Sequence, residues 1–128
     1  MKEYIVNILM VSLAILAPIQ PMLIACGFLI VVDTITGVVA AHKRKESISS
    51  AQMRRAVTKL FIYQLAIISG FVLEKYLMGG ILPVSKIVAG VIGMVEFKSI
   101  LENASTIAGE NILKLVMDKL GSKNAEKK

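Results

Sequence analysis

Hydrophobic residues form four long stretches along the chain, and one basic segment divides these stretches into two pairs. The stretches cover residues 4–19, 21–41, 60–78 and 81–97. A helix that crosses a bilayer needs about 20 apolar residues, because it rises about 1.5 Å per residue across a hydrocarbon core of about 30 Å. The pattern therefore predicts an all-α integral membrane protein with three to four transmembrane helices.

The composition indicates the same class of protein. Hydrophobic residues make up 55% of the 128 residues, and a soluble domain of this length needs more polar surface to stay dissolved. Four spans use about 80 residues, which leaves no room for a separate catalytic domain. We expect a single membrane domain over residues 1–121 and a polar tail over residues 122–128.

The first stretch is the least certain span, because Pro18 and Pro21 follow it closely. Two prolines three residues apart favour a tight turn over a continuous helix. As a helix, the residues 4–17 that precede Pro18 cover only about 21 Å. A short span, a re-entrant segment and an interfacial helix all stay open for this part of the chain.

The basic segment 42–59 sets the expected orientation. Cytoplasmic loops of membrane proteins carry an excess of Lys and Arg, and such residues also contact anionic lipid headgroups. We therefore expect a cytoplasmic loop over residues 42–59, within which Ser49 or Ser50 caps a helix that begins near Ala51. The basic residues of this loop are Lys43, Arg44, Lys45, Arg54, Arg55 and Lys59.

With four spans, a cytoplasmic loop in the middle places both termini in the cytoplasm, in a multi-pass arrangement within the bacterial cytoplasmic membrane. The net charge of +6 is also compatible with nucleic-acid binding. Both basic clusters flank apolar or amphipathic segments, however, so we interpret them as topology signals and expect no nucleic-acid partner.

The second stretch contains one carboxylate, Asp33, which shares a helix face with Gly37 and Ala41 at spacings of four residues. Small residues at this spacing allow a second helix to approach closely. Two interpretations stay open, and both can hold. The face is either a packed seam with a paired Asp33 or a surface for homo-oligomerisation.

Residues 98–120 predict an amphipathic helix that continues from the fourth stretch and ends near Gly121. Its polar stripe is either a solvated face or a seam between subunits. We expect Glu96 and Asn103 to reach interfacial water in a single chain and to contribute to assembly when several chains come together. At the opposite end of the molecule, Glu74 is placed to pair with Lys86. The stripe consists of Glu96, Ser99, Asn103, Thr106 and Glu110.

Catalytic and metal-binding patterns are absent from the sequence. Cys26 is the single cysteine and lies inside an apolar stretch, and His42 is the single histidine, so no metal-binding spacing can be formed. We find no nucleophile motif and no phosphate-binding glycine loop. The sequence therefore predicts a protein that is not an enzyme and needs no cofactor.

Two motifs resemble those of a known family. The first runs through the second stretch into the basic segment, and the second spans the end of the fourth stretch. The motif residues are Asp33, Gly37, Ala41, Ser49 and Lys59, followed by Glu96, Ser99, Ile100, Glu102 and Asn103. In order and spacing they are similar to the toxin-secretion/phage-lysis holin family of Gram-positive phages and clostridia, over roughly residues 31–110.

The resemblance implies a holin, which oligomerises in the cytoplasmic membrane and forms lesions that release an endolysin and trigger host lysis. The functional partner, an endolysin or a toxin, then needs no direct contact with the chain. Two alternatives stay open: a related export pore for a toxin or enzyme, and a non-pore component of a membrane or virion.

Overall fold

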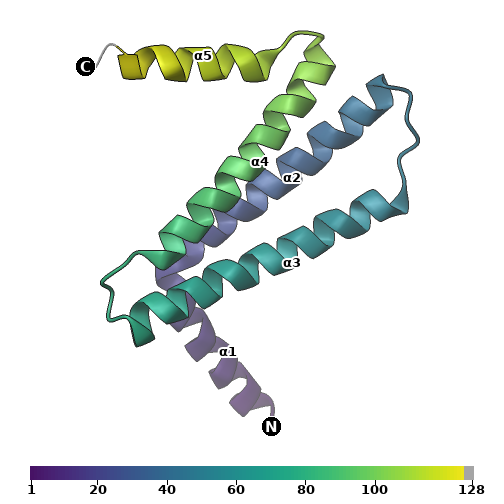
Figure 1. Cartoon of the computed structure of the whole chain (residues 1–128). Helices are drawn as coiled ribbons and strands as arrows, with labels where there is room; N and C mark the ends of the chain where they lie inside the picture. The colour runs from purple at the N-terminus through teal and green to yellow at the C-terminus, as the bar shows by residue number, and fades with distance from the viewer. Residues whose placement is uncertain (126–128) are drawn as a thin grey trace.

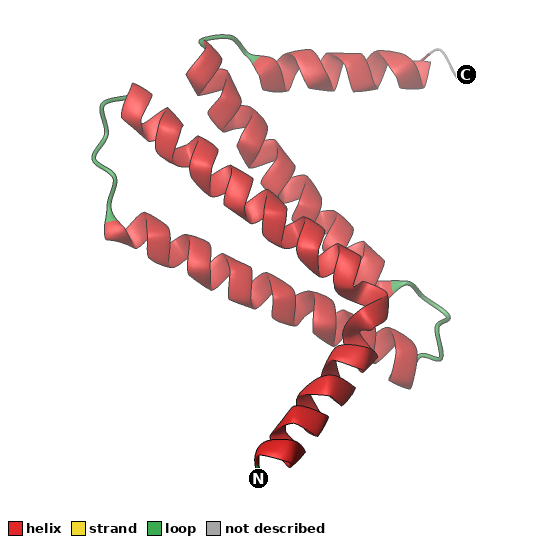
Figure 2. Cartoon of the chain, turned by 180° about the vertical axis from the view of Figure 1, so that it is seen from behind, coloured by secondary structure: helices red, strands yellow, loops and turns green. Residues whose placement is uncertain are grey.

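The computed structural model describes the backbone of residues 1–125 and the side chains of residues 1–122. These residues form helices joined by short connections and contain no strand, which confirms the predicted all-α class (Figures 1 and 2). The elements are α1 (Lys2–Leu16), the 3₁₀ turn η1 (Ala17–Ile19), α2 (Gln20–Lys43), α3 (Ser50–Val72), the π turn η2 (Leu73–Leu77), α4 (Val84–Ala108) and α5 (Ile112–Ala125).

Helices α2, α3 and α4 pack together, and we call them the three-helix unit. Helices α2 and α4 run in the same direction and make the most extensive contact, whereas α3 runs the opposite way (Figure 1). Helix α3 lies close to its neighbours near the α3–α4 connection and diverges from them toward the α2–α3 connection. Helix α5 runs crosswise at the far end of α4, and α1 extends away from the opposite end of the unit.

Two helical segments are long and apolar enough to cross a membrane within the described residues, Lys2–Lys43 and Ser50–Leu77. Helix α4 has sufficient length, but its apolar part is interrupted by charged side chains such as Lys86 and Glu96. Much of the outer surface is apolar, with Phe28 65% exposed and Met94 72% exposed. Such a surface is costly in water and suits a lipid environment.

The tight turn that the prolines predict does not form. The chain instead passes from α1 through η1 into α2 as a bent but continuous helical path (Figure 2). Pro18 and Pro21 each lie at the first or second position of their element, where a missing N–H leaves no hydrogen bond unmade. Helix α1 consequently does not fold back along α2, and none of its residues is buried.

A small apolar core holds the three-helix unit together where α3 approaches α4. Gly70 permits this approach, because a Cβ added there would lie 3.4 Å from the backbone Cα of Ser85. Small residues at such crossings allow van der Waals packing between helices in a membrane. The core cluster consists of Ile19, Cys26, Ile67, Phe71, Ala89 and Ile92.

The predicted loop over residues 42–59 is shorter than expected, since it spans only residues 44–49. Helix α2 continues to Lys43, and α3 begins at Ser50 with Ser49 as its N-cap, as the sequence predicted. The side chain of Gln52 accepts a hydrogen bond from the Ser49 N–H at 3.4 Å, which belongs to a capping box. The basic residues 54–59 therefore lie on the first turns of a helix.

The prediction of one amphipathic helix over residues 98–120 is wrong, because α4 ends at Ala108. Gly109 adopts a left-handed conformation with φ of 76° and ends the helix there. The side chain of Ser105 accepts a hydrogen bond from the Leu113 N–H at 3.2 Å, which fixes the corner between α4 and α5.

The expected end of the amphipathic helix near Gly121 also differs from the structure. Helix α5 continues through Gly121 to Ala125, so residues 122–125 of the expected polar tail are helical. The rest of that tail, residues 126–128, lies outside the described residues.

Candidate functional site: a polar network between three helices

One lysine joins carboxylates from two other helices near the middle of the three-helix unit, between the apolar core and the α2–α3 connection. The Nζ of Lys59 on α3 lies 3.1 Å from Oδ2 of Asp33 on α2 and 2.7 Å from Oε2 of Glu96 on α4. Both distances are those of charge-assisted hydrogen bonds. Residues separated by 26 and 37 positions in the sequence thus meet at a single cation.

Asn103 extends this network along α4, seven residues and about two turns beyond Glu96. Its Nδ2 donates to Oδ1 of Asp33 at 3.1 Å and lies 3.3 Å from Oγ1 of Thr36. Gly37 lies directly beside it, because a Cβ added there would lie 3.5 Å from Nδ2 of Asn103. The small residue at position 37 therefore lets the amide of α4 reach the backbone of α2. We call Asp33, Thr36, Lys59, Glu96 and Asn103 the polar network.

Burial makes the charges of the polar network energetically important. The side chain of Glu96 has no exposed surface, that of Asp33 is 14% exposed, and that of Lys59 is 33% exposed. Two carboxylates share one ammonium group, and Oε1 of Glu96 has no hydrogen-bond partner among the described residues. Removing one member of a buried ion pair typically costs about 3–5 kcal/mol, since the other is left uncompensated.

A polar cleft of about 390 Å³ opens above the polar network, where α3 diverges from α2 and α4. Asp33, Lys59 and Asn103 line it from the network side, while Arg44 and Arg55 line it from the α2–α3 connection. Asp33 and Lys59 are therefore reachable by water from this end, whereas Glu96 is not. On the opposite side the apolar core separates them from the α3–α4 connection.

Sequence reasoning missed two polar residues of this region. Gln64 donates from Nε2 to the backbone carbonyl of Leu23 at 2.9 Å and ties α3 to α2. Thr36 accepts from Asn103 and also donates to the carbonyl of Val32 at 2.9 Å. A glutamine inside an otherwise apolar stretch is the signal that could have identified Gln64, because an amide in that position needs a partner.

The structure brings together the two family motifs, whose nearest members, Lys59 and Glu96, lie 37 residues apart in the sequence. Asp33, Lys59, Glu96 and Asn103 meet, and Gly37 and Ala41 pack inside the same chain, with Ala41 fully buried. Within the single chain, the face of Asp33, Gly37 and Ala41 is thus a packed seam with a paired Asp33, which is the first of its two interpretations. The expectation that Glu96 reaches interfacial water in a single chain is wrong, because Lys59 and the surrounding helices enclose it.

The remaining motif residues lie around the network. Ser99 lines the polar cleft, Ile100 is partly buried, and Ser49 caps α3. Glu102 is exposed and lies 3.6 Å from Lys98 on the outer side of α4. In the predicted polar stripe, Glu96, Ser99 and Asn103 thus face the other helices, and Glu110 lies after the end of α4.

The basic residues of the α2–α3 connection have distinct roles. Lys43 donates to the backbone carbonyl of Ile107, so the last turn of α2 is tied to that of α4. Arg44 forms two hydrogen bonds with the carboxylate of Glu46, at 2.9 and 3.0 Å, and these lower the pKa of Glu46. Lys45, Arg54 and Arg55 are exposed at the same end of the molecule.

The predicted pair of Glu74 and Lys86 does not form. Glu74 instead accepts hydrogen bonds from the backbone N–H of Ser85 at 3.0 Å and from its hydroxyl at 2.6 Å. The first N–H groups of a helix have no partner within the helix, so a carboxylate is stabilising at that position. Glu74 therefore caps α4 from the end of α3.

The apolar exterior and the enclosed polar network together define a small helical membrane protein. The chain matches the bacteriophage holin family over residues 10–122 and belongs to that family. This match confirms the resemblance that the two sequence motifs carried. Comparison with curated proteins gives no match, and neither does comparison with solved structures.

Proposed function

We propose that this protein is a holin that accumulates in the bacterial cytoplasmic membrane and assembles into homo-oligomeric lesions. An endolysin leaves the cytoplasm through these lesions and needs no direct contact with the chain. Membership of the bacteriophage holin family, over residues 10–122, is the observation that carries this proposal. The role requires no catalysis and no cofactor.

The polar network supports a two-state behaviour of the kind that a lesion-forming protein needs. In the single chain, Asp33, Lys59 and Glu96 meet between helices, where the ammonium group offsets part of the charge of the two carboxylates and none of the three faces lipid. Each such charge costs about 2.5–3.5 kcal/mol when it is placed at the centre of a lipid-exposed helix. Once the unit opens, these groups are stable only beside water or beside a neighbouring copy. We infer that the motif residues act in assembly after this opening.

The placement of the helices in the bilayer follows from the basic residues. We infer that α2, α3 and α4 cross the membrane, with the α2–α3 connection and α5 in the cytoplasm. Helix α4 can cross although it is charged, because α2 and α3 enclose Glu96. At about 1.5 Å per residue, the 24 residues of α2 cover about 36 Å, which exceeds the hydrocarbon core of about 30 Å.

The position of the N-terminus depends on α1. If α1 also crosses, both termini are cytoplasmic, as the sequence analysis expects. If α1 remains at the outer side, the N-terminus is outside the cell. The bend at η1 favours the second arrangement, because α1 does not fold back along α2. Labelling of a single cysteine at position 2, in a chain with Cys26 replaced by Ala, distinguishes the two arrangements.

Inducible expression in bacteria tests the proposed function, with membrane potential and culture density recorded with and without a co-expressed endolysin. We expect the membrane potential to collapse in both cultures and the density to fall sharply only when the endolysin is present. Purified chain should also release dye from vesicles. Membrane insertion without dye release would contradict the holin role and favour a non-pore membrane component.

A further inference from the structure

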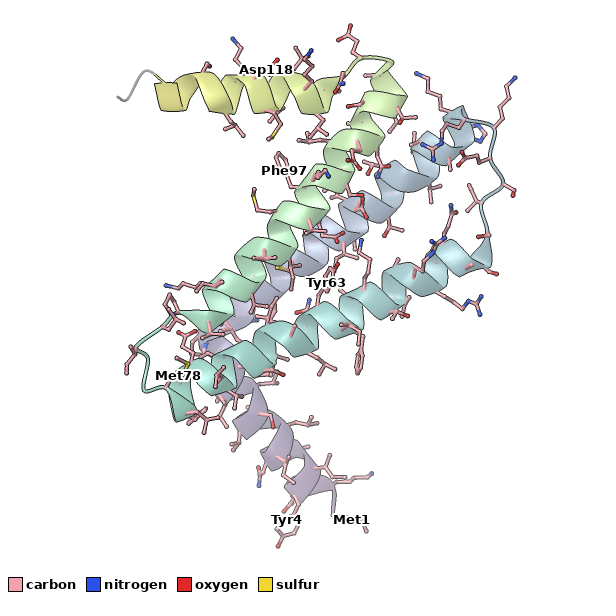
Figure 3. All side chains as sticks on the ribbon, in the orientation of Figure 1. Met1, Tyr4, Tyr63, Met78, Phe97 and Asp118 are labelled. Atoms are coloured by element: carbon pink, nitrogen blue, oxygen red, sulfur yellow. The ribbon has the colours of Figure 1, made fainter. Side chains whose placement is uncertain are left out.

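Helices α4 and α5 form a second cavity, open on one side, that differs from the polar cleft in chemistry. It measures about 380 Å³, lies in the corner beneath α5, and has an almost entirely apolar wall. Figure 3 shows Phe97 on the side of α4 that lies below α5. Ligand sites commonly measure about 300–1,000 Å³. The wall of this cavity includes Met94, Phe97, Leu113, Met117 and Leu120, with Lys98 at its edge.

The sequence of α5 accounts for this cavity. Leu113, Val116, Met117 and Leu120 recur at the spacing of one helix face and all line it. Lys114 and Asp118 lie on other faces and do not line it. Since Gly109 turns the chain sharply, α5 lies crosswise over α4, and the apolar face of α5 meets the apolar side of α4 at a corner that the two helices do not fill.

We propose that this cavity binds an acyl chain of a membrane phospholipid, with the lipid phosphate beside Lys98. The cavity is continuous with the exposed apolar side of α4, where Met94 is 72% exposed and Val95 is 52% exposed. In the proposed topology that side faces lipid. The cavity also lies at the end of the molecule that carries the basic α2–α3 connection, which is where headgroups are expected.

The charges around the cavity are complementary to an anionic lipid. Lys98 lies at its edge, and its contact with Glu102 is long, at 3.6 Å, so the ammonium group remains available to a phosphate. Lys114 and Lys119 add positive charge on α5. Each basic residue near a membrane surface contributes about 1 kcal/mol of attraction to anionic lipid. An amphipathic helix with an apolar face and basic residues is typical of interfacial helices.

The test uses the absence of tryptophan from this chain, so that one introduced tryptophan is the only indole. The full chain is reconstituted in vesicles of phosphatidylglycerol and phosphatidylcholine that carry bromine on their acyl chains. Met117→Trp and Leu120→Trp place the probe at the cavity, and Leu115→Trp is the matched control. Met117 is 60% exposed and Leu115 is 58% exposed, so the two differ in direction and not in exposure.

We expect bromine to quench tryptophan at positions 117 and 120 several-fold more strongly than at position 115, and aqueous iodide to show the opposite order. Lys98→Gln should lower the preference for phosphatidylglycerol about fivefold while acyl-chain quenching persists. Equal quenching at the three positions would overturn the proposal. So would quenching at position 117 that falls as the protein-to-lipid ratio rises, because a second copy would then occupy the cavity.

The inference rests on the proposed membrane placement but not on lesion formation, and one further variant separates the two. Phe28→Trp places the probe on the exposed apolar side of α2. If bromine quenches position 28 but not positions 117 and 120, membrane insertion stands and the acyl-chain site is wrong. If bromine quenches none of these positions, the proposed membrane placement and the acyl-chain site both fail.

Discussion

The ammonium group of Lys59 on α3 lies 2.7 Å from a carboxylate oxygen of Glu96 on α4, and that carboxylate has no exposed surface. Glu96 therefore depends on Lys59 for its charge to be tolerated inside the unit. Because Asp33 on α2 binds the same ammonium group, one side chain of α3 bonds to both of the other helices.

Replacing Lys59 should destabilise the three-helix unit strongly. Lys59→Ala leaves Asp33 and Glu96 as neighbouring carboxylates without a cation, and we expect a loss of about 3–5 kcal/mol in the free energy of unfolding. Unfolding of the purified chain in mixed micelles measures this loss. Arg54→Ala is the matched control, because Arg54 is an exposed cation on the same helix. Equal stability of the two variants would show that the ion pairs contribute nothing.

A large side chain at position 37 should separate α2 from α4. A Cβ at Gly37 already lies 3.5 Å from Asn103, so the larger Gly37→Leu side chain displaces the amide and costs about 1–3 kcal/mol. We expect insertion to be retained and lysis to be delayed or abolished. Gly90→Leu is the control on α4, since a Cβ there meets no described atom within 4 Å. Unchanged unfolding and unchanged lysis timing in Gly37→Leu would contradict this packing role.

The cap that Glu74 provides to α4 should be measurable as local stability. Glu74→Ala removes both hydrogen bonds to Ser85, and loss of a helix cap costs about 0.5–2 kcal/mol. Hydrogen exchange at the amides of the first turn of α4 should accelerate accordingly. Glu102→Ala removes an exposed carboxylate from the same helix and should change stability by less than about 0.5 kcal/mol. Similar exchange in both variants would exclude the capping role.

Two glycines in the C-terminal region should respond to alanine with opposite signs. Gly109 has φ of 76°, a conformation that side chains rarely adopt, so Gly109→Ala should cost about 1 kcal/mol and favour a continuous helix. Gly121 lies inside α5, where Gly121→Ala should stabilise the helix by about 0.5–1 kcal/mol. Thermal unfolding followed by circular dichroism compares the two. Stabilisation by both substitutions would mean that the corner at Gly109 is not required.

The helices and their approximate positions could be predicted from the sequence, because apolar stretches of this length have few alternative structures. The N-cap at Ser49 followed from local chemistry in the same way. The continuation of the helix through Pro18 could not be anticipated from proline counting alone. The sequence places Pro21 in the first turn of a helix, but the 3₁₀ turn that accommodates Pro18 between α1 and α2 follows only from the three-dimensional path.

Every residue of the polar network except Thr36 was found from the sequence, but their mutual contacts were not. Asp33 stood out because a carboxylate is costly in an apolar stretch, and this cost says that a partner exists without saying where it lies. Glu96 was identified from the polar stripe and the family motif, at a place in the sequence where interfacial water was the expected partner. The partner of both is Lys59, which looked like one of several cations of a basic segment, and its role depends on the packing of α3, which carries Lys59 between α2 and α4.

Because the chain bends at η1, α1 extends away from the three-helix unit and does not pack along it. The path from α1 to α2 contains 42 residues and is about 63 Å long at about 1.5 Å per residue, roughly twice the hydrocarbon thickness. Helix α1 buries none of its side chains. Of its residues, only Leu16, at its last position, packs on the core cluster. An apolar arm of about 22 Å thus projects from the three-helix unit. In the proposed homo-oligomer, we expect copies to touch through α1 while every Lys59 stays paired.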